Sequence, residues 1–148
     1  MASTEDLQFY FFHFMPYADY PADHESYPST WVDFPNTLFD PEKGKAFYDR
    51  YLREMVLADK LGFDAMVVNE HHSTAYSLMP APSLIAAALI PQTTRAKICV
   101  FGTPLNLEYP HRVAEEYAML DVMSGGRLEC ALPLGTGMEY WVNPINPA

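Results

Sequence analysis

The sequence predicts an α/β protein with a parallel β-sheet, because segments typical of β-strands alternate with segments of helical periodicity. The strand-like segments are Leu7–Phe14, Ala65–Val68, Ile98–Phe101 and Leu128–Leu132. The second and third are apolar at every position, as is usual for parallel strands that lie between two packed layers. This alternation favours strands that are connected by helices rather than by hairpins.

The first helix has clear signals at both ends. Asp40 is a favourable N-cap residue, Pro41 suits the first helical turn, and Gly62 can take the left-handed conformation that ends a helix. Two further helices are predicted, from Ser83 towards Pro91 and from about Arg112 to Ser124, the last one closed by Gly125 and Gly126.

The segment 15–39 is much longer than an ordinary connection between a strand and a helix. It is rich in Pro, Tyr, Asp and Ser, and it contains Trp31, Phe34 and Phe39, which favour an ordered cover over the neighbouring elements. Residues 143–148 resemble a turn that leads into another helix, with Asn146 as its cap. We expect one domain over residues 1–148, with a long loop at about 15–39.

Composition limits the classes of partner. With 49% hydrophobic and 19% charged residues the chain should fold into a globular unit. Its net charge of −10, and nine Lys and Arg without a basic cluster, argue against nucleic acid and anionic membranes as partners. The absence of a leader-like or membrane-spanning segment predicts a cytoplasmic protein. Cys99 and Cys130 lie in apolar segments, so we expect reduced core cysteines.

Asn69, Glu70, His71 and His72 directly follow the strand Ala65–Val68. Chemistry in parallel α/β proteins gathers at the carboxyl ends of strands. The residues alone leave three interpretations: a histidine general acid or base, a metal site, or polar groups that merely satisfy a strand end. Neighbouring side chains on an extended chain point to opposite sides. A metal site would therefore need ligands from elsewhere, such as His13 or His111.

Four motifs, in this order, resemble the bacterial luciferase-like flavin monooxygenases. They are Gly62–His72, Pro80–Ser83 with the alanine-rich helix after it, Pro110–Glu116 and Leu120–Leu128. The resemblance is dense from about Tyr51 to Leu132 and thin in the long loop and the last sixteen residues. It implies that the chain forms the N-terminal part, about four strands, of a (β/α)8 TIM barrel of the luciferase-like type.

The resemblance also implies a function. Family members use reduced FMN, supplied by a separate NAD(P)H-dependent flavin reductase, and O2 to oxygenate a small organic substrate. They are commonly dimers through their second and third helices, so a homo-oligomer or a complementary half-barrel is expected. His71 matches the first histidine of the family's pair and is the leading catalytic candidate, with His72 and Glu70 as further candidates and no metal.

The turn Phe101–Gly102–Thr103 matches the place where family members carry a bulge and a non-proline cis peptide under the flavin ring. On this resemblance the three residues are candidate cofactor-binding residues, and a cis peptide is expected next to Gly102. From the residues alone, an ordinary turn before a proline fits equally. The segment Leu132–Gly137 departs from the family, which often places a basic residue there, near the flavin phosphate.

Four strands are too few to close a barrel, so both edges of the sheet should be unpaired. We expect exposed inward-facing side chains, among them Met66, Val68, Val100 and Leu132, weak FMN binding, and no activity of the 148-residue chain alone. The alternatives are a non-catalytic binding or assembly half-barrel, a deazaflavin-dependent dehydrogenase of the same fold, and a metal-dependent hydrolase that uses Glu70, His71 and His72.

Overall fold

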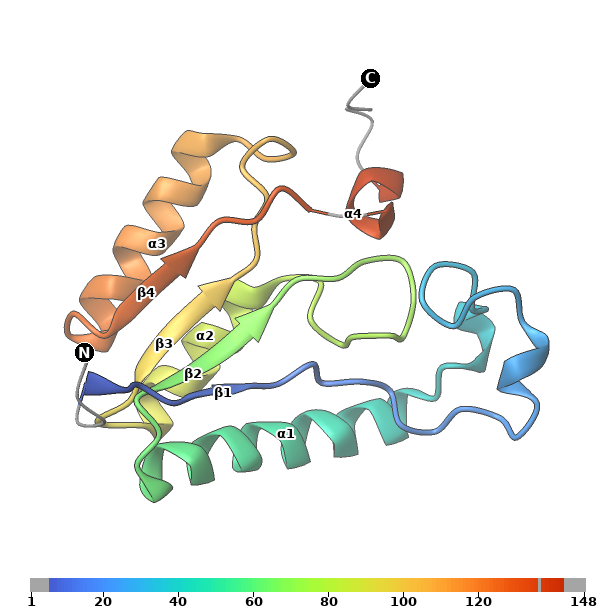
Figure 1. Ribbon diagram of the computed structural model, residues 1–148, viewed down its shortest axis with the longest axis horizontal. Helices are drawn as coiled ribbons and strands as arrows, with labels where there is room; N and C mark the ends of the chain where they lie inside the picture. The colour runs from blue at the N-terminus through green and yellow to red at the C-terminus, as the bar shows by residue number, and fades with distance from the viewer. Residues whose placement is uncertain (1–5, 136, 143–148) are drawn as a thin grey trace.

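A computed structural model describes residues 6–135 and 137–142 of the chain (Figure 1). The helix that the sequence predicts after residue 143 lies outside the described residues. Within them, no helix combines the length and the apolar character that a membrane span requires.

The four predicted strands form one parallel sheet in the order β1-β2-β3-β4. The strands are β1 (Tyr10–Phe12), β2 (Ala65–Asn69), β3 (Lys97–Phe101) and β4 (Leu128–Ala131). The edge strands β1 and β4 are shorter than the apolar segments that predicted them. Each edge strand is hydrogen-bonded to a neighbouring strand on one side only. Its terminal residues therefore leave the extended conformation closer to the middle of the strand than those of β2 and β3 do.

The helices are α1 (Pro41–Leu61), α2 (Pro82–Leu89), α3 (Pro110–Ser124) and α4 (Gly137–Val142), and a 3-10 turn (Ile90–Gln92) extends α2. The predicted caps of α1 are confirmed: the Asp40 carboxylate accepts hydrogen bonds from two backbone N–H groups, and Gly62 is left-handed with φ 99°. Gly125 ends α3 in the same way, with φ 70°. The short helix α4 was not predicted.

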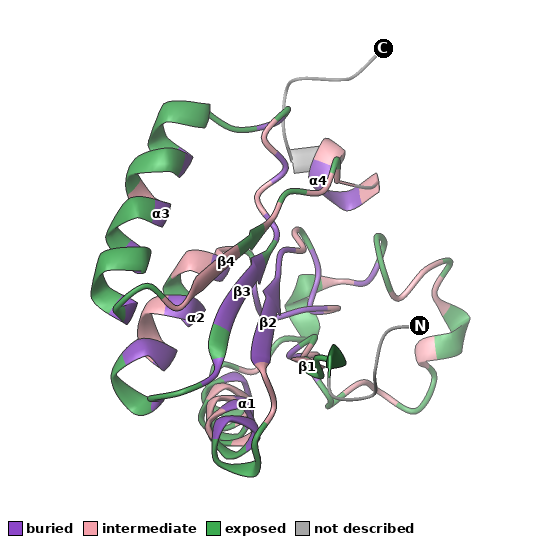
Figure 2. Ribbon diagram, turned by 60° about the vertical axis from the view of Figure 1, so that its left-hand side comes forward, coloured by how far each residue is buried: buried purple, intermediate pink, exposed green. Residues whose placement is uncertain are grey.

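Helices α1, α2 and α3 cover one face of the sheet, and the core lies between the two layers (Figures 1 and 2). Met66, Val68 and Val100 are fully buried in this core. Their expected exposure on the inward face is therefore wrong. Side chains alternate between the faces of a strand, and here the alternate set, Ala65, Val67 and Cys99, lies on the face away from the helices.

The face away from the helices has no layer over it in the described part of the chain. Tyr10, Phe12 and Phe101 are each at least 40% exposed there, and Leu132 after β4 is exposed as expected. Cys99, on the central strand β3, is buried and free, in agreement with the prediction. Cys130 is also free but exposed, contrary to the prediction, because it lies on the edge strand β4.

The long loop packs as an ordered cover at the end of the sheet to which the strands point (Figure 1). Met15, Tyr17 and Phe34 are buried within it. Hydrogen bonds join the loop to the β2–α2 connection, among them one from the Asn36 amide to the Ser73 carbonyl (2.6 Å) and one from the Thr74 hydroxyl to the Trp31 carbonyl (2.7 Å). These contacts bring two distant loops over the carboxyl ends of the strands.

Candidate functional site

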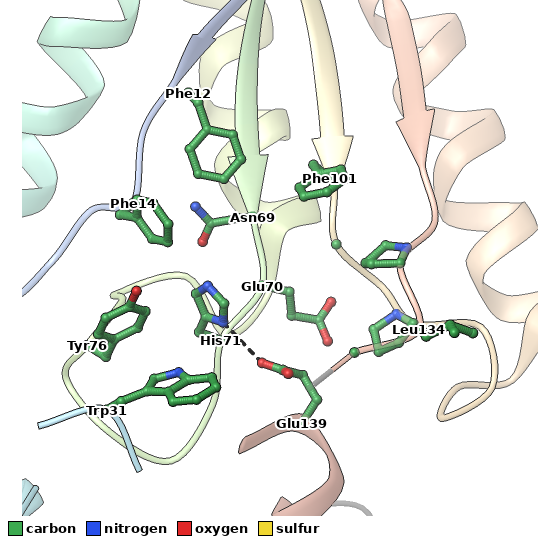
Figure 3. A pocket seen from close by; sticks show the side chains of 14 residues that line it. Phe12, Phe14, Trp31, Asn69, Glu70, His71, Tyr76, Phe101, Leu134 and Glu139 are labelled. Carbon is green, nitrogen blue, oxygen red and sulfur yellow. Dashed lines mark hydrogen bonds and ion pairs between the residues drawn. The ribbon is translucent and has the colours of Figure 1, made fainter. Parts of the chain in front are cut away.

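A cavity of about 370 Å³ lies at the carboxyl ends of the strands, beneath the two loops (Figure 3). Its walls come from β1, β2 and β3, the long loop, the β2–α2 connection, the segment after β4, and α4. The lining residues are Phe12, Phe14, Trp31, Asn69, Glu70, His71, Tyr76, Phe101, Gly102, Pro104, Pro133, Leu134, Gly135 and Glu139.

Aromatic rings form much of the wall. Phe12 on β1 meets Phe101 at the end of β3 edge to face, with ring centres 6.0 Å apart. Phe14 meets Tyr76 in the same manner at 5.7 Å, and Trp31 of the long loop lies 6.3 Å from Tyr76. Such rings offer flat, apolar and rigid surfaces. The cavity therefore suits a planar organic group.

His71 is held from three sides. Its Nδ1 atom lies 3.1 Å from Oε1 of Glu139. Its ring is nearly parallel to that of Phe14, with centres 5.8 Å apart and an angle of 5° between the planes. The edge of Tyr76 approaches the same ring at 5.2 Å. Figure 3 shows the histidine between these groups, so its orientation at the cavity wall is defined.

Glu70 joins the end of β2 to the turn after β3. One carboxylate oxygen lies 2.9 Å from Nε2 of His72, and the other accepts a hydrogen bond from the Thr103 N–H at 2.7 Å. The hydrogen bond to Glu70 raises the pKa of His72, although burial opposes this change. Burial raises the pKa of the nearby Glu108 carboxyl, and the charge of Glu70 adds to the effect. This carboxylate thus holds two loops at the cavity together.

Gly102 lies in close packing. A Cβ atom built on it would come 2.8 Å from Cβ of Glu70 and 3.0 Å from Cγ of Pro82. The expected cis peptide beside Gly102 is wrong, because the described residues contain only trans bonds. The chain turns instead through Thr103, which is left-handed with φ 61°. Its N–H is the group held by Glu70, and this contact stabilises the turn with trans bonds.

Four of the six predicted site residues line the cavity: Glu70, His71, Phe101 and Gly102. His72 and Thr103 are not part of the lining; they contact Glu70 behind it. The sequence analysis missed the aromatic lining and Glu139. The spacing of Phe12 and Phe14, two residues apart in the strand-like segment Leu7–Phe14, was the available signal that both side chains face the same side. Glu139 had no such signal, because the last residues carry no periodic pattern.

Arg112 and Arg127, which belong to two of the family-like motifs, lie outside the cavity lining and serve the fold. Arg127 donates hydrogen bonds to the carbonyl oxygens of Ile90, Thr93 and Ala96, and Arg112 contacts Glu116 at 3.1 Å. Among the described residues that line the cavity there is no Lys or Arg. The described residues also include no group of three His, Cys, Asp or Glu side chains placed to hold a metal ion. The described residues therefore offer no set of ligands for the metal site that the metal-dependent hydrolase alternative needs.

Comparison with known proteins gives the same picture as the fold. A family model described as luciferase-like monooxygenase matches residues 32–139. The chain is 35% identical over 83 residues to the alkanal monooxygenase beta chain of Vibrio harveyi, covering 53% of this chain and 26% of that protein. It is 28% identical over 112 residues to the oxygenase component of flavin-dependent trigonelline monooxygenase from Acinetobacter baylyi, and this match covers 69% of this chain and 31% of that protein.

Among solved structures, the chain is similar to the oxygenating constituent of 3,6-diketocamphane monooxygenase from Pseudomonas putida, determined in complex with FMN. The TM-score is 0.71 at 21% identity, and the match covers 95% of this chain but 33% of that one. The described sheet thus resembles the N-terminal part of a luciferase-like barrel. The chain spans between a quarter and a third of the length of these relatives. On the family match and this shared fold, the chain belongs to the luciferase-like monooxygenase family.

Proposed function

We propose that this chain forms the N-terminal part of a flavin-dependent monooxygenase that uses reduced FMN and O2 to oxygenate a small organic substrate. The observation that carries the proposal is the aromatic cavity at the carboxyl ends of the strands, with His71 fixed in its wall. Family membership and the FMN named for a protein of the same fold support flavin as the cofactor.

The described residues fit one part of FMN better than the other. The flat aromatic walls and a volume of about 370 Å³ suit the isoalloxazine ring. The phosphate is an anion, and the described lining residues offer no Lys or Arg for it. We therefore assign ring binding to this segment, with Phe101 and Gly102 in direct contact and Thr103 holding their turn. When bound, reduced flavin would supply the electrons for the reaction with O2.

His71 would act as the general acid or base at the cavity wall, since it is the titratable ring whose position there is defined by three neighbours. The aromatic side chains around it would exclude water from the reaction. Glu70 would hold the turn of Gly102 and Thr103 in place, and His72 would hold Glu70. Glu70, in the cavity wall, and His72, behind it, would support the site rather than act on the substrate.

Two kinds of partner complete the proposal. A separate NAD(P)H-dependent reductase would supply reduced FMN, in keeping with the relative named as an oxygenase component. A second copy of the chain would pack on the outer surface of α2 and α3. Leu84, Met119, Val122 and Met123 are all more than half exposed there, and exposed apolar patches mark contact sites. A complementary half-barrel would cover the open face of the sheet.

The proposal is tested in a complete barrel that contains this segment. Replacing His71 with Ala should slow the substrate-dependent oxidation of reduced FMN by ~10²–10⁴-fold. Thermal unfolding and flavin binding should change little. His72→Ala is the matched control and should reduce the rate less, because His72 contacts Glu70 and not the cavity. Full activity of the His71 variant together with loss in the His72 variant would reverse the two roles.

A further inference from the structure

We infer that Glu139 is the positioning residue for His71: its carboxylate accepts the Nδ1–H of the imidazole, which leaves Nε2 as the nitrogen presented to a molecule in the cavity. The inference rests on the proposed function, in which His71 is the acid or base. It adds a residue from a part of the chain where neither spacing nor resemblance indicated a site.

The contact is built into the fold. Glu139 lies on α4, 68 residues from His71, and it is only 3% exposed. Helix α4 is seated by its own packing: Met138 is buried, and the Tyr140 hydroxyl donates to the Leu134 carbonyl at 2.8 Å. The carboxylate thus reaches His71 from a defined position.

The chemistry of the two groups determines where the proton lies. An ionised carboxylate can only accept hydrogen bonds, so the nitrogen 3.1 Å from Oε1 must carry the hydrogen. A neutral His71 then has its lone pair on Nε2 and can take a proton there; after protonation the same atom can donate one. The parallel ring of Phe14 and the edge of Tyr76 oppose rotation of the imidazole. Nδ1 is thereby bound to Glu139, and Nε2 is left to interact with a molecule in the cavity.

The adjacent histidine provides an internal comparison. His72 uses its Nε2 atom, not Nδ1, to contact a carboxylate, Glu70. By the same argument its neutral form carries the hydrogen on Nε2. Two neighbouring histidines are therefore held in opposite tautomers by two different glutamates. This difference can be measured directly on the chain without any cofactor or substrate.

The test is ¹⁵N NMR of the imidazole nitrogens in the 148-residue chain, at a pH high enough for both rings to be neutral. The sequence contains five histidines, and His71→Gln and His72→Gln identify the two signals of interest. We expect the hydrogen on Nδ1 of His71 and on Nε2 of His72. Glu139→Leu should move the His71 hydrogen to Nε2, the tautomer that free imidazole prefers, and leave His72 unchanged.

Glu139→Gln serves where the Leu variant does not fold. It keeps an oxygen acceptor without the charge, so the Nδ1–H proton signal of His71 should move upfield as the hydrogen bond weakens. The inference is overturned if the wild-type chain carries the His71 hydrogen on Nε2, or if folded Glu139 variants leave the His71 signals unchanged.

Activity separates this inference from the proposed function. In a complete barrel, Glu139→Leu should lower kcat by about 10–100-fold or more, with a smaller change in KM; the lower figure is the effect known for partners that orient metal-bound histidines, and the orienting carboxylate of a catalytic triad has a larger one. If NMR confirms the tautomer but His71→Ala retains activity, the proposed function fails and the control of His71 by Glu139 stands. If His71→Ala is inactive but NMR places the His71 hydrogen on Nε2, the proposed function stands and the control of His71 by Glu139 fails.

Discussion

The Tyr10 hydroxyl donates a hydrogen bond to the Glu129 carboxylate, 2.6 Å away, across the face of the sheet opposite the helices. Tyr10 lies on β1 and Glu129 on β4, the two edge strands. In a flat sheet these strands would be roughly 14 Å apart, given the usual spacing of neighbouring strands. Two long side chains bridge most of this separation, and the curvature of a barrel-like sheet, which brings side chains on its inner face together, favours the contact. Lys97, on β3 between them, also contacts Glu129.

This contact predicts a late-titrating tyrosine. The hydrogen bond to Glu129, with a smaller effect of burial, raises the pKa of Tyr10 to about 12. A raised tyrosine pKa stabilises the fold at pH values below the unfolded value of 10, and the effect is lost as pH rises towards 12. In absorbance at 295 nm, Tyr10→Phe should remove one phenol from the late part of the titration. Tyr117 should still titrate in this late part in the variant, because burial raises its pKa to about 12. If only the part near pH 10 loses amplitude, the prediction is wrong.

The Glu70–His72 contact predicts how stability depends on pH. The hydrogen bond to Glu70 raises the pKa of His72 from its usual 6.5. The contact therefore stabilises the fold fully below about pH 6.5, and the stabilisation is lost as pH rises through the folded pKa. Urea unfolding of the wild type and of His72→Gln should show a stability difference at pH 6 that shrinks at alkaline pH. A difference independent of pH would contradict this assignment.

Gly102 should not tolerate a side chain. Alanine there would place Cβ 2.8 Å from Cβ of Glu70, and overpacking of this kind costs about 1–3 kcal/mol. We expect Gly102→Ala to lower the free energy of unfolding and to weaken flavin binding in a complete barrel. Gly137→Ala is the matched control, since no atom lies within 4 Å of the Cβ it would add. Equal stability of the two variants in denaturant titrations would argue against the packing.

The 148-residue chain alone should bind FMN weakly and associate. The described lining of the cavity offers no Lys or Arg for the phosphate. FMN and riboflavin should therefore bind with similar, low affinities in fluorescence titrations. The apolar surfaces of the open sheet face and of α2 and α3 favour assemblies larger than 16.8 kDa in light scattering. Micromolar FMN binding by a monodisperse monomer would refute both parts.

Local signals in the sequence determined the elements and the general position of the site. Asp40 and Gly62 mark the ends of α1 because caps depend on the backbone of a few adjacent residues. The four strands were found because their apolar segments are short and separated by helical patterns. His71 could be named as a candidate because sites in parallel α/β folds lie at strand ends, and the structure places it in the cavity wall. The family motifs gave the curved, barrel-like arrangement.

Tertiary structure alone decided which side chains meet. Met66 and Val68 face the helices rather than the inward face, since a strand apolar at every position carries no signal for its orientation. His71 lines the cavity whereas His72 contacts Glu70 behind it; both residues lie beyond the end of β2, where the alternation of a strand no longer decides which side chain faces the cavity. Glu139 reaches His71 only when α4 lies at the cavity beside the β2–α2 connection, and no local pattern encodes a contact between residues 68 positions apart.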